Sequence, residues 1–183
     1  MNHTRRHQGD SKRVLAMARK PLMLPVVSLG AEFLTMGYLM RRNILAYKAP
    51  PNNEGYDFIC IHPNPRKVRK QIRVQVKSRY QTDSSKGVFV KKRSLNAFDY
   101  LIVVLLNIGY FYRKTSLPGG LKEAEFYTLS RSFVRRYHVL RKSGLDRLIL
   151  KRLNVERYKN EKGFEFIARD LLIPYPKRPR RGR

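Results

Sequence analysis

The stretch Ile72-Arg73-Val74-Gln75-Val76-Lys77-Ser78 predicts the β-strand around which the fold is organised, because it is rich in β-branched residues. Side chains alternate between the two faces of a strand, so Gln75 and Lys77 share one face while Val74 and Val76 share the other. The valines indicate a face that packs on a hydrophobic core. The glutamine and the lysine indicate a polar face.

A shorter strand is expected just upstream, carrying Asp57 in Gly55-Tyr56-Asp57-Phe58-Ile59 and continuing to Ile61. The turn residues His62-Pro63-Asn64-Pro65 follow it, so we expect the two strands to pair as a hairpin. Such a hairpin would bring the Asp57 carboxylate to the same end as Gln75 and Lys77. A carboxylate, an amide oxygen and an ammonium group at one point suit a divalent cation and a phosphate better than a core.

A helix of roughly four turns is predicted before this hairpin, with Ser28 as its N-cap and Asn43 as the left-handed residue that ends it. Residues that recur at helical spacing give it one apolar face: Phe33, Met36, Gly37 and Met40. Glu32 lies in its first turn. Alone, Glu32 would be an ordinary acid stabilised by the helix dipole, but with Asp57 and the Gln75-Val76-Lys77 tripeptide downstream it becomes a candidate metal-site residue.

After the hairpin, the run from Tyr100 to Leu106 predicts a central strand covered on both faces, because it is apolar throughout. Asp99 precedes this strand, and we expect it to cap or orient the preceding turn rather than to act in catalysis. Gly109-Tyr110-Phe111-Tyr112 and Phe126-Tyr127-Thr128-Leu129 predict the far edge of the sheet.

The order of helix Glu32, strand Asp57, Gln75-Val76-Lys77 and a fully apolar strand resembles the PD-(D/E)xK nuclease superfamily, over roughly residues 25 to 130. In that superfamily a helix Glu, a strand Asp and a (D/E)-x-K tripeptide form a metal-dependent phosphodiesterase site. Gln75 departs from the usual acid and is similar to the variant found in homing endonucleases of group I introns and in some restriction enzymes. The resemblance implies an α/β fold with a restriction-endonuclease-like αβββαβ core and a mixed sheet.

The resemblance also implies roles for the site residues. Asp57 would be the main metal ligand, the Gln75 side-chain oxygen and the Val76 backbone carbonyl would complete the pocket, and Glu32 would act directly or through water. Lys77 would position the attacking water or neutralise charge on the phosphate. The expected cofactor is Mg²⁺, with Mn²⁺ as the alternative, and the missing carboxylate at Gln75 predicts weak metal affinity until DNA phosphate joins, or one metal rather than two.

The composition restricts the class of protein. A chain of 183 residues suits one compact domain with tails, and 42% hydrophobic residues exclude wholesale disorder. The formal net charge of +27 indicates a nucleic-acid partner, and it fits a structural protein of a ribosome or nucleoid as well as an enzyme. Cys60 is the only cysteine, which excludes an internal disulfide and a thiolate zinc cage and favours a cytoplasmic, nucleoid-associated location.

Three regions are expected: a basic arm over 1–20, a nuclease-like core over 21–130, and a basic extension over 131–183 with helices near Val134–Leu140 and Leu145–Leu153 and a Pro/Arg-rich tail. The arm is either a DNA-contacting segment or a transit peptide for organellar import. The candidate DNA contacts are Arg66, Lys67, Arg69 and Lys70 at the hairpin tip, Arg79 after the strand, and Lys91, Lys92 and Arg93 beyond it.

Together these features predict a Mg²⁺-dependent endonuclease of the homing or restriction type that cleaves double-stranded DNA. A homodimer or higher homo-oligomer is expected because two strands must be cut. Two alternatives share the expected fold, namely a Holliday junction resolvase and an inactive nucleic-acid-binding relative. The alternative of another class is a basic structural protein, which has no need to place Asp57, Gln75 and Lys77 together.

Overall fold

A computed structural model describes residues 25–50, 53, 55–79, 87–107, 123–139, 147–150 and 153–176. Several predicted segments lie outside these ranges: the arm over 1–20, the loop residues 80–86, the strand at 109–112 and the tail residues 177–183.

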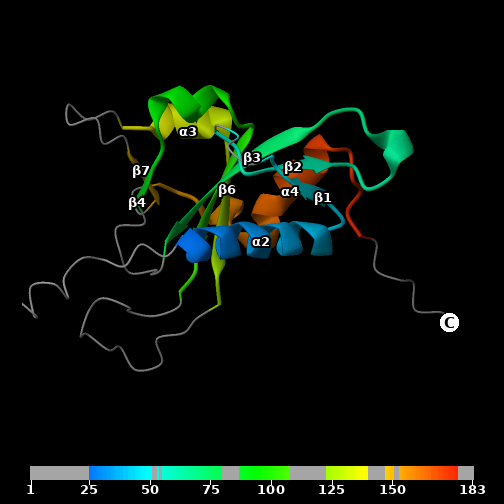
Figure 1. Ribbon diagram of the computed structural model, residues 1–183, viewed down its shortest axis with the longest axis horizontal. Helices are drawn as coiled ribbons and strands as arrows, with labels where there is room; N and C mark the ends of the chain where they lie inside the picture. Colours follow the sequence, from blue (N-terminus) through cyan, green and yellow to red (C-terminus); the bar gives the residue numbers. More distant parts are fainter. Residues whose placement is uncertain are drawn as a thin grey trace, which may run out of the picture.

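The centre of the molecule is a five-stranded mixed sheet with the order β1-β2-β3-β5-β6 (Figure 1). Its strands are β1 (Leu45–Lys48), β2 (Phe58–Ile61), β3 (Ile72–Arg79), β5 (Tyr100–Leu105) and β6 (Glu125–Ser130). The β1–β2, β2–β3 and β5–β6 pairs are antiparallel, and β3–β5 is parallel. The predicted α/β class with a mixed sheet is confirmed, as are the hairpin and the edge position of β6.

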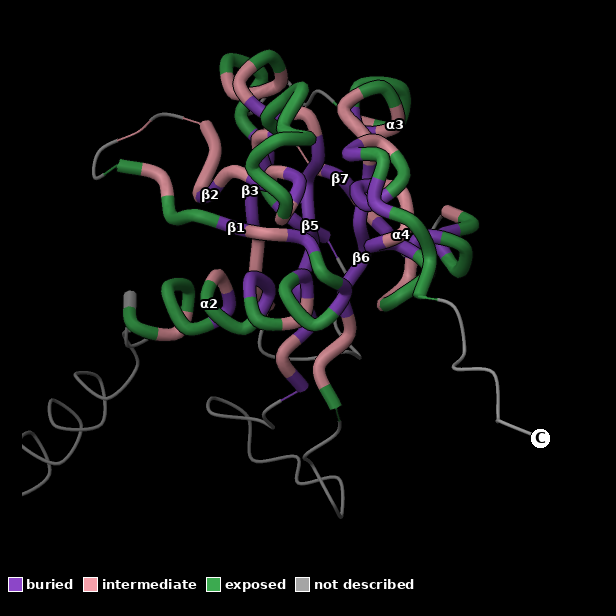
Figure 2. Tube along the Cα trace, turned by 90° about the vertical axis from the view of Figure 1, so that its right-hand side faces the viewer, coloured by how far each residue is buried: buried purple, intermediate pink, exposed green. Residues whose placement is uncertain are grey.

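The sheet is covered on both faces by separate hydrophobic cores. Val74 and Val76 of β3 belong to the first core, and Leu101 and Val103 of β5 belong to the second. All six residues of β5 are buried, which confirms a strand covered on both sides. Figure 2 shows the buried strands in the middle of the molecule, and Figure 1 shows α2 and α3 on opposite sides of them.

The first core lies under α2 (Pro25–Arg41), which begins three residues before the predicted N-cap because Pro25 is favourable in a first helical turn. The predicted apolar face is right at Met36 and wrong at Phe33, Gly37 and Met40, which are exposed. The helix instead buries Ala31, Thr35 and Leu39 together with Met36. The small residues of the row Ala31–Thr35 allow the helix to approach the sheet closely, and the Thr35 hydroxyl donates to the Ala31 carbonyl at 2.7 Å. Asn43 ends the helix at φ 65°, as predicted.

The second core lies under a small two-stranded sheet and short helices. These elements are β4 (Gly87–Phe89), η2 (Lys92–Asn96), α3 (Arg131–Tyr137), β7 (Arg147–Ile149) and η4 (Glu156–Tyr158). β4 and η2 occupy the crossover from β3 to β5, which is the place of the second helix in the αβββαβ pattern. The helix predicted over Leu145–Leu153 is wrong in its described part, because residues 147–149 pair with β4 and bury Leu148 in this core.

The region after residue 131 supplies part of both cores, so the described structure shows no break there. The helix α4 (Asn160–Asp170) packs on the first core through Phe164, Ile167 and Ala168. The buried Arg42 at the end of α2 pairs with Glu165 of α4 and donates to the Pro174 carbonyl at 3.3 Å. In the described part of the chain, no helix is long and apolar enough to cross a membrane.

The packing of α4 predicts unequal effects at two neighbouring leucines. Leu171→Ala should lower the free energy of unfolding by about 2–5 kcal/mol, because Leu171 is 4% exposed in the first core. Leu172→Ala should change it by less than about 0.5 kcal/mol, because Leu172 is 70% exposed. Urea denaturation of both variants measures the difference. Equal effects would mean that residues after 160 are not part of the core.

Candidate functional site

Asp57 is held against β3 at the point where β2 begins. Its backbone N–H donates to the Val74 carbonyl at 2.8 Å, and its carboxylate Oδ2 accepts from the Val76 N–H at 2.6 Å. Since Phe58 pairs with Val74 in an antiparallel register, Asp57 lies opposite Gln75. The hairpin therefore brings the carboxylate beside the Gln75-Val76-Lys77 tripeptide, as the sequence led us to expect.

Gln75 is only 6% exposed, and its Oε1 has no hydrogen-bond donor among the described residues. The sequence predicted a polar face here. The structure instead covers this face with the second core, because β4, η2 and α3 fold over it. Burying an amide oxygen without a hydrogen-bond donor lowers stability by roughly 1–3 kcal/mol. Gln75 Oε1 is therefore a buried acceptor that no described residue uses.

Lys77 lies two residues further along the same face of β3, beside Val103 of β5. It is partly buried, and no described carboxylate forms an ion pair with it. Its ammonium group is therefore available to an anionic ligand.

The Val76 carbonyl lies on the open side of β3. Successive residues of a strand direct their backbone N–H and C=O groups to opposite edges of the strand. The backbone carbonyl of Val74 points to β2, where it accepts from Asp57 N, and that of Arg73 points to β5, where it accepts from Asp99 N. Val76 follows Val74, and its N–H already binds Asp57 on that side. Since β2 begins only at Phe58, no described strand pairs with β3 at the level of the Val76 carbonyl.

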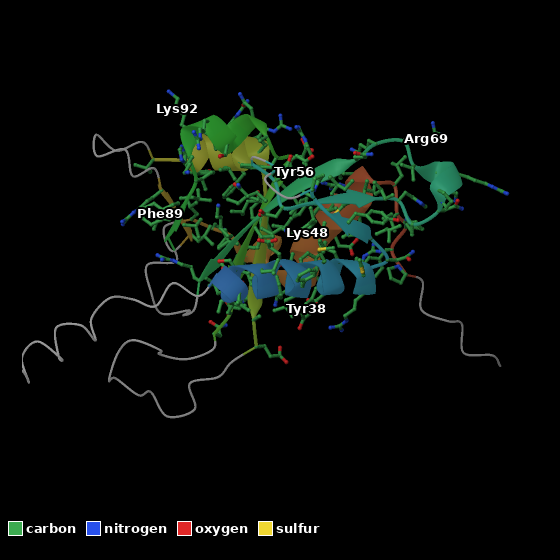
Figure 3. All side chains as sticks on the ribbon, in the orientation of Figure 1. Tyr38, Lys48, Tyr56, Arg69, Phe89 and Lys92 are labelled. Atoms are coloured by element: carbon green, nitrogen blue, oxygen red, sulfur yellow. The ribbon has the colours of Figure 1, made fainter. Side chains whose placement is uncertain are left out.

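Glu32 is not brought together with Gln75 and Lys77. It lies on α2, which packs against the opposite face of β3, and it forms an ion pair with Lys48 at the end of β1. Lys48 also donates to the Asp57 carbonyl at 3.1 Å, so Lys48 links Glu32 to the site. Figure 3 shows Lys48 between Tyr56 and the helix α2.

Sequence reasoning missed Lys48. A signal was present in the alternation of β1, because Lys48 shares the α2-facing side of the strand with the buried Ala46. Residues two apart in a strand point to the same face, so this alternation places Lys48 on the same face as Ala46, toward the helix.

Asp99 joins three elements and lies outside the candidate site. It accepts from the Arg73 backbone N–H at 2.9 Å and from the Arg73 guanidinium at 3.2 Å, and it forms an ion pair with Arg131 at the start of α3. Burial alone would raise the pKa of Asp99. The hydrogen bonds and charge of Arg73, together with the charge of Arg131, outweigh burial and hold this pKa below its usual range.

The predicted DNA-contacting residues fall into two exposed groups and one partly buried residue. Arg66, Lys67, Arg69 and Lys70 surround η1 (Pro65–Lys67) at the hairpin tip, and Lys91, Lys92 and Arg93 lie at η2. Figure 3 shows Arg69 and Lys92 in separate parts of the molecule. Lys70 also lies 3.7 Å from Asp170.

Arg79 differs from the other predicted contacts, because it lies partly buried on the Gln75 face of β3. Burial lowers the pKa of Arg79, and the charge of Arg147 on β7 lowers it further. The Nε atoms of both arginines are buried without a hydrogen-bond partner among the described residues. Two arginines close together without a described counter-charge favour a bound anion, and Arg147 was not identified from the sequence.

The described residues contain no cluster of three or more His, Cys, Asp or Glu side chains that could hold a metal ion. The donors that remain at the site are the Asp57 carboxylate, the unpartnered Gln75 Oε1 and the Val76 carbonyl. Oxygen donors of this kind fit a hard cation such as Mg²⁺, although they provide only one negative charge.

No protein-family model and no curated protein matches the chain. Among solved structures, the chain is similar to a bacterial homing endonuclease, I-Ssp6803I, at 15% sequence identity and a TM-score of 0.47. The similarity covers 79% of this chain and 91% of that chain. At this level of similarity, the function has to be argued from the side chains themselves.

The lowered pKa of Asp99 predicts a pH-dependent contribution to stability. Asp99→Asn should lower the free energy of unfolding by roughly 2 kcal/mol at neutral pH, because it removes charged hydrogen bonds to Arg73. A carboxylate with a depressed pKa stabilises the folded state above its unfolded pKa of about 3.9 and loses this contribution as the pH falls through the folded value. The difference between wild type and variant should therefore shrink below about pH 4.

Urea denaturation of both proteins at neutral pH and near pH 3 measures this difference. Glu161→Gln is the matched control, because it removes an exposed carboxylate from α4. A wild-type to Asp99→Asn difference that is unchanged in acid would contradict the ion-pair role of Asp99.

Proposed function

We propose that the protein is a Mg²⁺-dependent endonuclease that hydrolyses phosphodiester bonds in double-stranded DNA. The observation that carries the proposal is the Asp57 carboxylate bonded to β3 beside Gln75, whose buried amide oxygen has no donor among the described residues. Lys77 follows on the same face without a described carboxylate partner. A protein that only binds polyanions gains nothing from a buried acceptor next to a carboxylate.

In this proposal, Asp57, the Gln75 side-chain oxygen and the Val76 carbonyl hold the metal ion. The ion, when bound, would supply charge stabilisation and an activated water for phosphodiester hydrolysis. Because Gln75 replaces a carboxylate, the site has low negative charge, and a DNA phosphate would contribute to binding the ion. Mn²⁺ suits the same oxygen donors.

The other side chains position the reactants. Lys77 would neutralise charge that develops on the scissile phosphate or orient the attacking water. Glu32 would act as a positioning residue, since it holds Lys48, and Lys48 holds the Asp57 carbonyl. The sequence led us to expect Glu32 to act on the metal directly or through water, and we propose this positioning role instead.

DNA binding is supported by the net charge of +27 and by the two exposed basic groups at the hairpin tip and at η2. The Arg79 and Arg147 pair would bind a phosphate nearer to the site, because Arg79 shares the face of Gln75 and Lys77. Phosphate contacts of this kind position a duplex but do not select its sequence.

Asp57→Ala and Lys77→Ala should each reduce the cleavage rate by about 100-fold or more, because each removes a group that acts at the scissile phosphate. Both should leave the affinity for DNA within a few-fold of wild type. A supercoiled plasmid pool with randomised inserts, incubated with Mg²⁺, reports cleavage at whichever target sequence the protein selects. Gel shift of the same DNA reports binding.

Lys162→Ala is the matched control, since it removes an exposed lysine on α4 that is not part of the candidate site. EDTA should stop cleavage by the wild type and by the control. Cleavage by Asp57→Ala at the wild-type rate would overturn the proposal. Binding without cleavage by all proteins would favour the inactive nucleic-acid-binding alternative.

We further propose that two copies of the chain act together, because each copy presents one such site and a duplex has two strands. The helix α2 leaves a row of large apolar side chains exposed. These residues are Val26, Leu29, Phe33, Leu34 and Met40, between 38% and 73% exposed. A second copy related by a two-fold axis would cover this row with its own α2.

The double substitution Leu29→Ser with Phe33→Ser should convert a dimer into a monomer, because it removes the two central apolar side chains of this row. Sedimentation velocity of the full chain measures the change in mass. Leu172→Ser is the matched control, since it replaces an exposed leucine outside α2. A wild-type monomer, or a dimer that the double substitution leaves intact, would contradict the α2 interface.

A further inference from the structure

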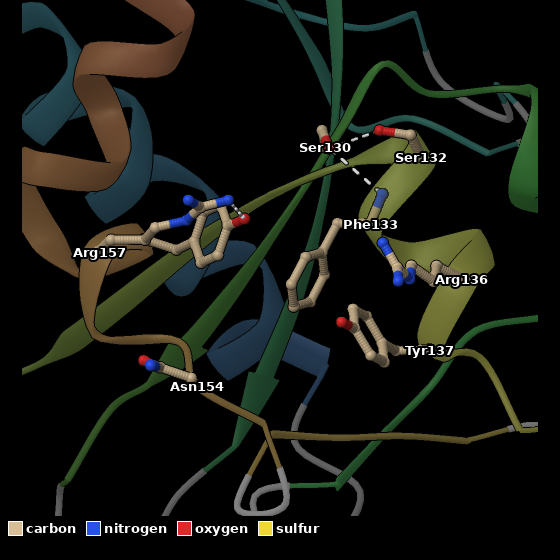
Figure 4. A pocket seen from close by; sticks show the side chains of 8 residues that line it. Ser130, Ser132, Phe133, Arg136, Tyr137, Asn154 and Arg157 are labelled. Atoms are coloured by element: carbon tan, nitrogen blue, oxygen red, sulfur yellow. Dashed lines mark hydrogen bonds between the residues drawn. The ribbon is translucent and has the colours of Figure 1, made fainter.

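A polar pocket of about 450 Å³ lies between α3 and the segment that includes η4 (Figure 4). Its volume falls within the roughly 300–1,000 Å³ typical of small-ligand sites. Phe133 and Tyr158 belong both to its lining and to the second core, so the pocket lies on the same side of the sheet as Gln75 and Lys77. None of its lining residues belongs to the candidate catalytic site.

Two arginines give the pocket a positive charge. Arg136 comes from α3 and Arg157 from η4, and Figure 4 shows them on opposite sides of the Phe133 ring. Both side chains are exposed, and neither forms an ion pair with a described carboxylate. Each guanidinium lies over a tyrosine ring, Arg136 at 5.6 Å from Tyr137 and Arg157 at 4.7 Å from Tyr158. This stacking holds planar donors in place for an anion such as phosphate.

Aromatic rings form the apolar wall. Phe133 lies 4.7 Å from Tyr137 and 4.9 Å from Tyr158 between ring centroids. Tyr158 is buried, which fixes one end of the cluster, whereas Tyr137 at the other end is 37% exposed. A rigid aromatic cluster with one exposed ring offers a surface on which a flat base can stack.

Hydrogen-bonding groups complete the lining. Ser130 and Ser132 share a hydrogen bond at 3.0 Å, and Ser130 also accepts from Phe133 N at 3.3 Å. Asn154 contributes an exposed amide from the opposite wall (Figure 4). Hydroxyl and amide groups both donate and accept, so they can pair with the edge of a base or with a sugar hydroxyl.

We propose that this pocket binds one unpaired nucleotide of a DNA strand, with its phosphate on Arg136 and Arg157 and its base against Tyr137. The combination of two guanidinium groups without a described carboxylate partner, an exposed aromatic ring and neutral hydrogen-bonding groups matches the three parts of a nucleotide. A paired base inside a duplex cannot enter such a pocket, so the ligand is a base displaced from the stack. The choice of DNA as the source of the nucleotide rests on the proposed function.

The position of the pocket fits a strand that also reaches Asp57. The register places Phe58, Val74, Tyr100 and Ser130 at one level across four adjacent strands. Three strand spacings of about 4.8 Å put Ser130 roughly 15 Å from the start of β2. At about 3.4 Å per base step, the displaced nucleotide would lie about four steps from a phosphate at Asp57.

The test compares two short labelled duplexes of the same sequence, one fully paired and one with a single bulged nucleotide. The full-length Asp57→Ala protein is the background, so that binding is measured by fluorescence anisotropy without cleavage. In this background, Arg157→Ala and Tyr137→Leu should each weaken binding of the bulged duplex by about 5- to 100-fold, the range expected for loss of one stacked base. The affinity for the paired duplex should change less than about threefold, as expected for one phosphate contact in salt.

Arg135→Ala is the matched control for charge, because Arg135 lies on the same helix, is exposed and pairs with Asn96 outside the pocket. Tyr175→Leu is the control for an exposed tyrosine elsewhere. Equal losses for bulged and paired duplexes, or losses no larger than those of Arg135→Ala, would show that the pocket contributes only positive charge and would overturn the proposal.

A deoxynucleoside monophosphate tests the source of the nucleotide by competition. If it displaces both duplexes equally while the bulge gives no advantage, the pocket binds free nucleotide and the DNA-strand proposal is overturned. Bulge selectivity that requires Arg157 and Tyr137 supports the pocket even if the wild-type protein cleaves no DNA, so this test and the test of the endonuclease fail independently.

Discussion

The hydrogen bond from the Val76 N–H to the Asp57 carboxylate is the interaction on which the candidate site depends. β2 begins only at Phe58, so no described strand pairs with Val76 on that side of β3, and the Asp57 carboxylate accepts its N–H instead. The carboxylate takes the place of the missing strand. This fixes an acidic group at the level of Gln75. The geometry of the site therefore follows from where one strand begins.

The coverage of both faces of β3 changes what its polar residues can do. On an open face, Gln75, Lys77 and Arg79 would be hydrated and would need no protein partner. Under β4, η2 and α3, the Gln75 and Arg79 side chains lose contact with water. Gln75 Oε1 and Arg79 Nε gain no hydrogen-bond partner among the described residues in return. Each loss is unfavourable by an amount comparable to a hydrogen bond. A ligand with a cation next to Gln75 Oε1 and an anion next to Arg79 Nε would replace both lost interactions. A metal-bound phosphate has this arrangement of charges.

How far the sequence predicted the structure depends on the range of the interactions. The β2–β3 hairpin, the alternation of Gln75 and Lys77 with the valines, and the left-handed Asn43 depend on neighbours in the chain, and they were predicted. The burial of Gln75 depends on β4 pairing with β7, which joins segments far apart in sequence, and no local pattern indicates that pairing. The buried side of α2 was mispredicted because small residues, Ala31 and Thr35, pack closest to the sheet. Within the candidate site, the local hairpin makes Asp57 a neighbour of β3, whereas Glu32 lies on the opposite face of β3 and pairs with Lys48, which becomes its neighbour only after folding.

The first core combines residues from both ends of the described chain, from Ala31 on α2 to Ile173 after α4. During synthesis, the N-terminal residues leave the ribosome first, but α2 covers only part of the apolar side of their sheet, and the rest stays uncovered until α4 has also emerged. Contacts between such distant segments form slowly, because the chain between them must first lose the conformational entropy of closing a long loop. The order of translation thus delays assembly of the Asp57 region until almost all of the described polypeptide has been made, and a shortened chain would leave this core incomplete.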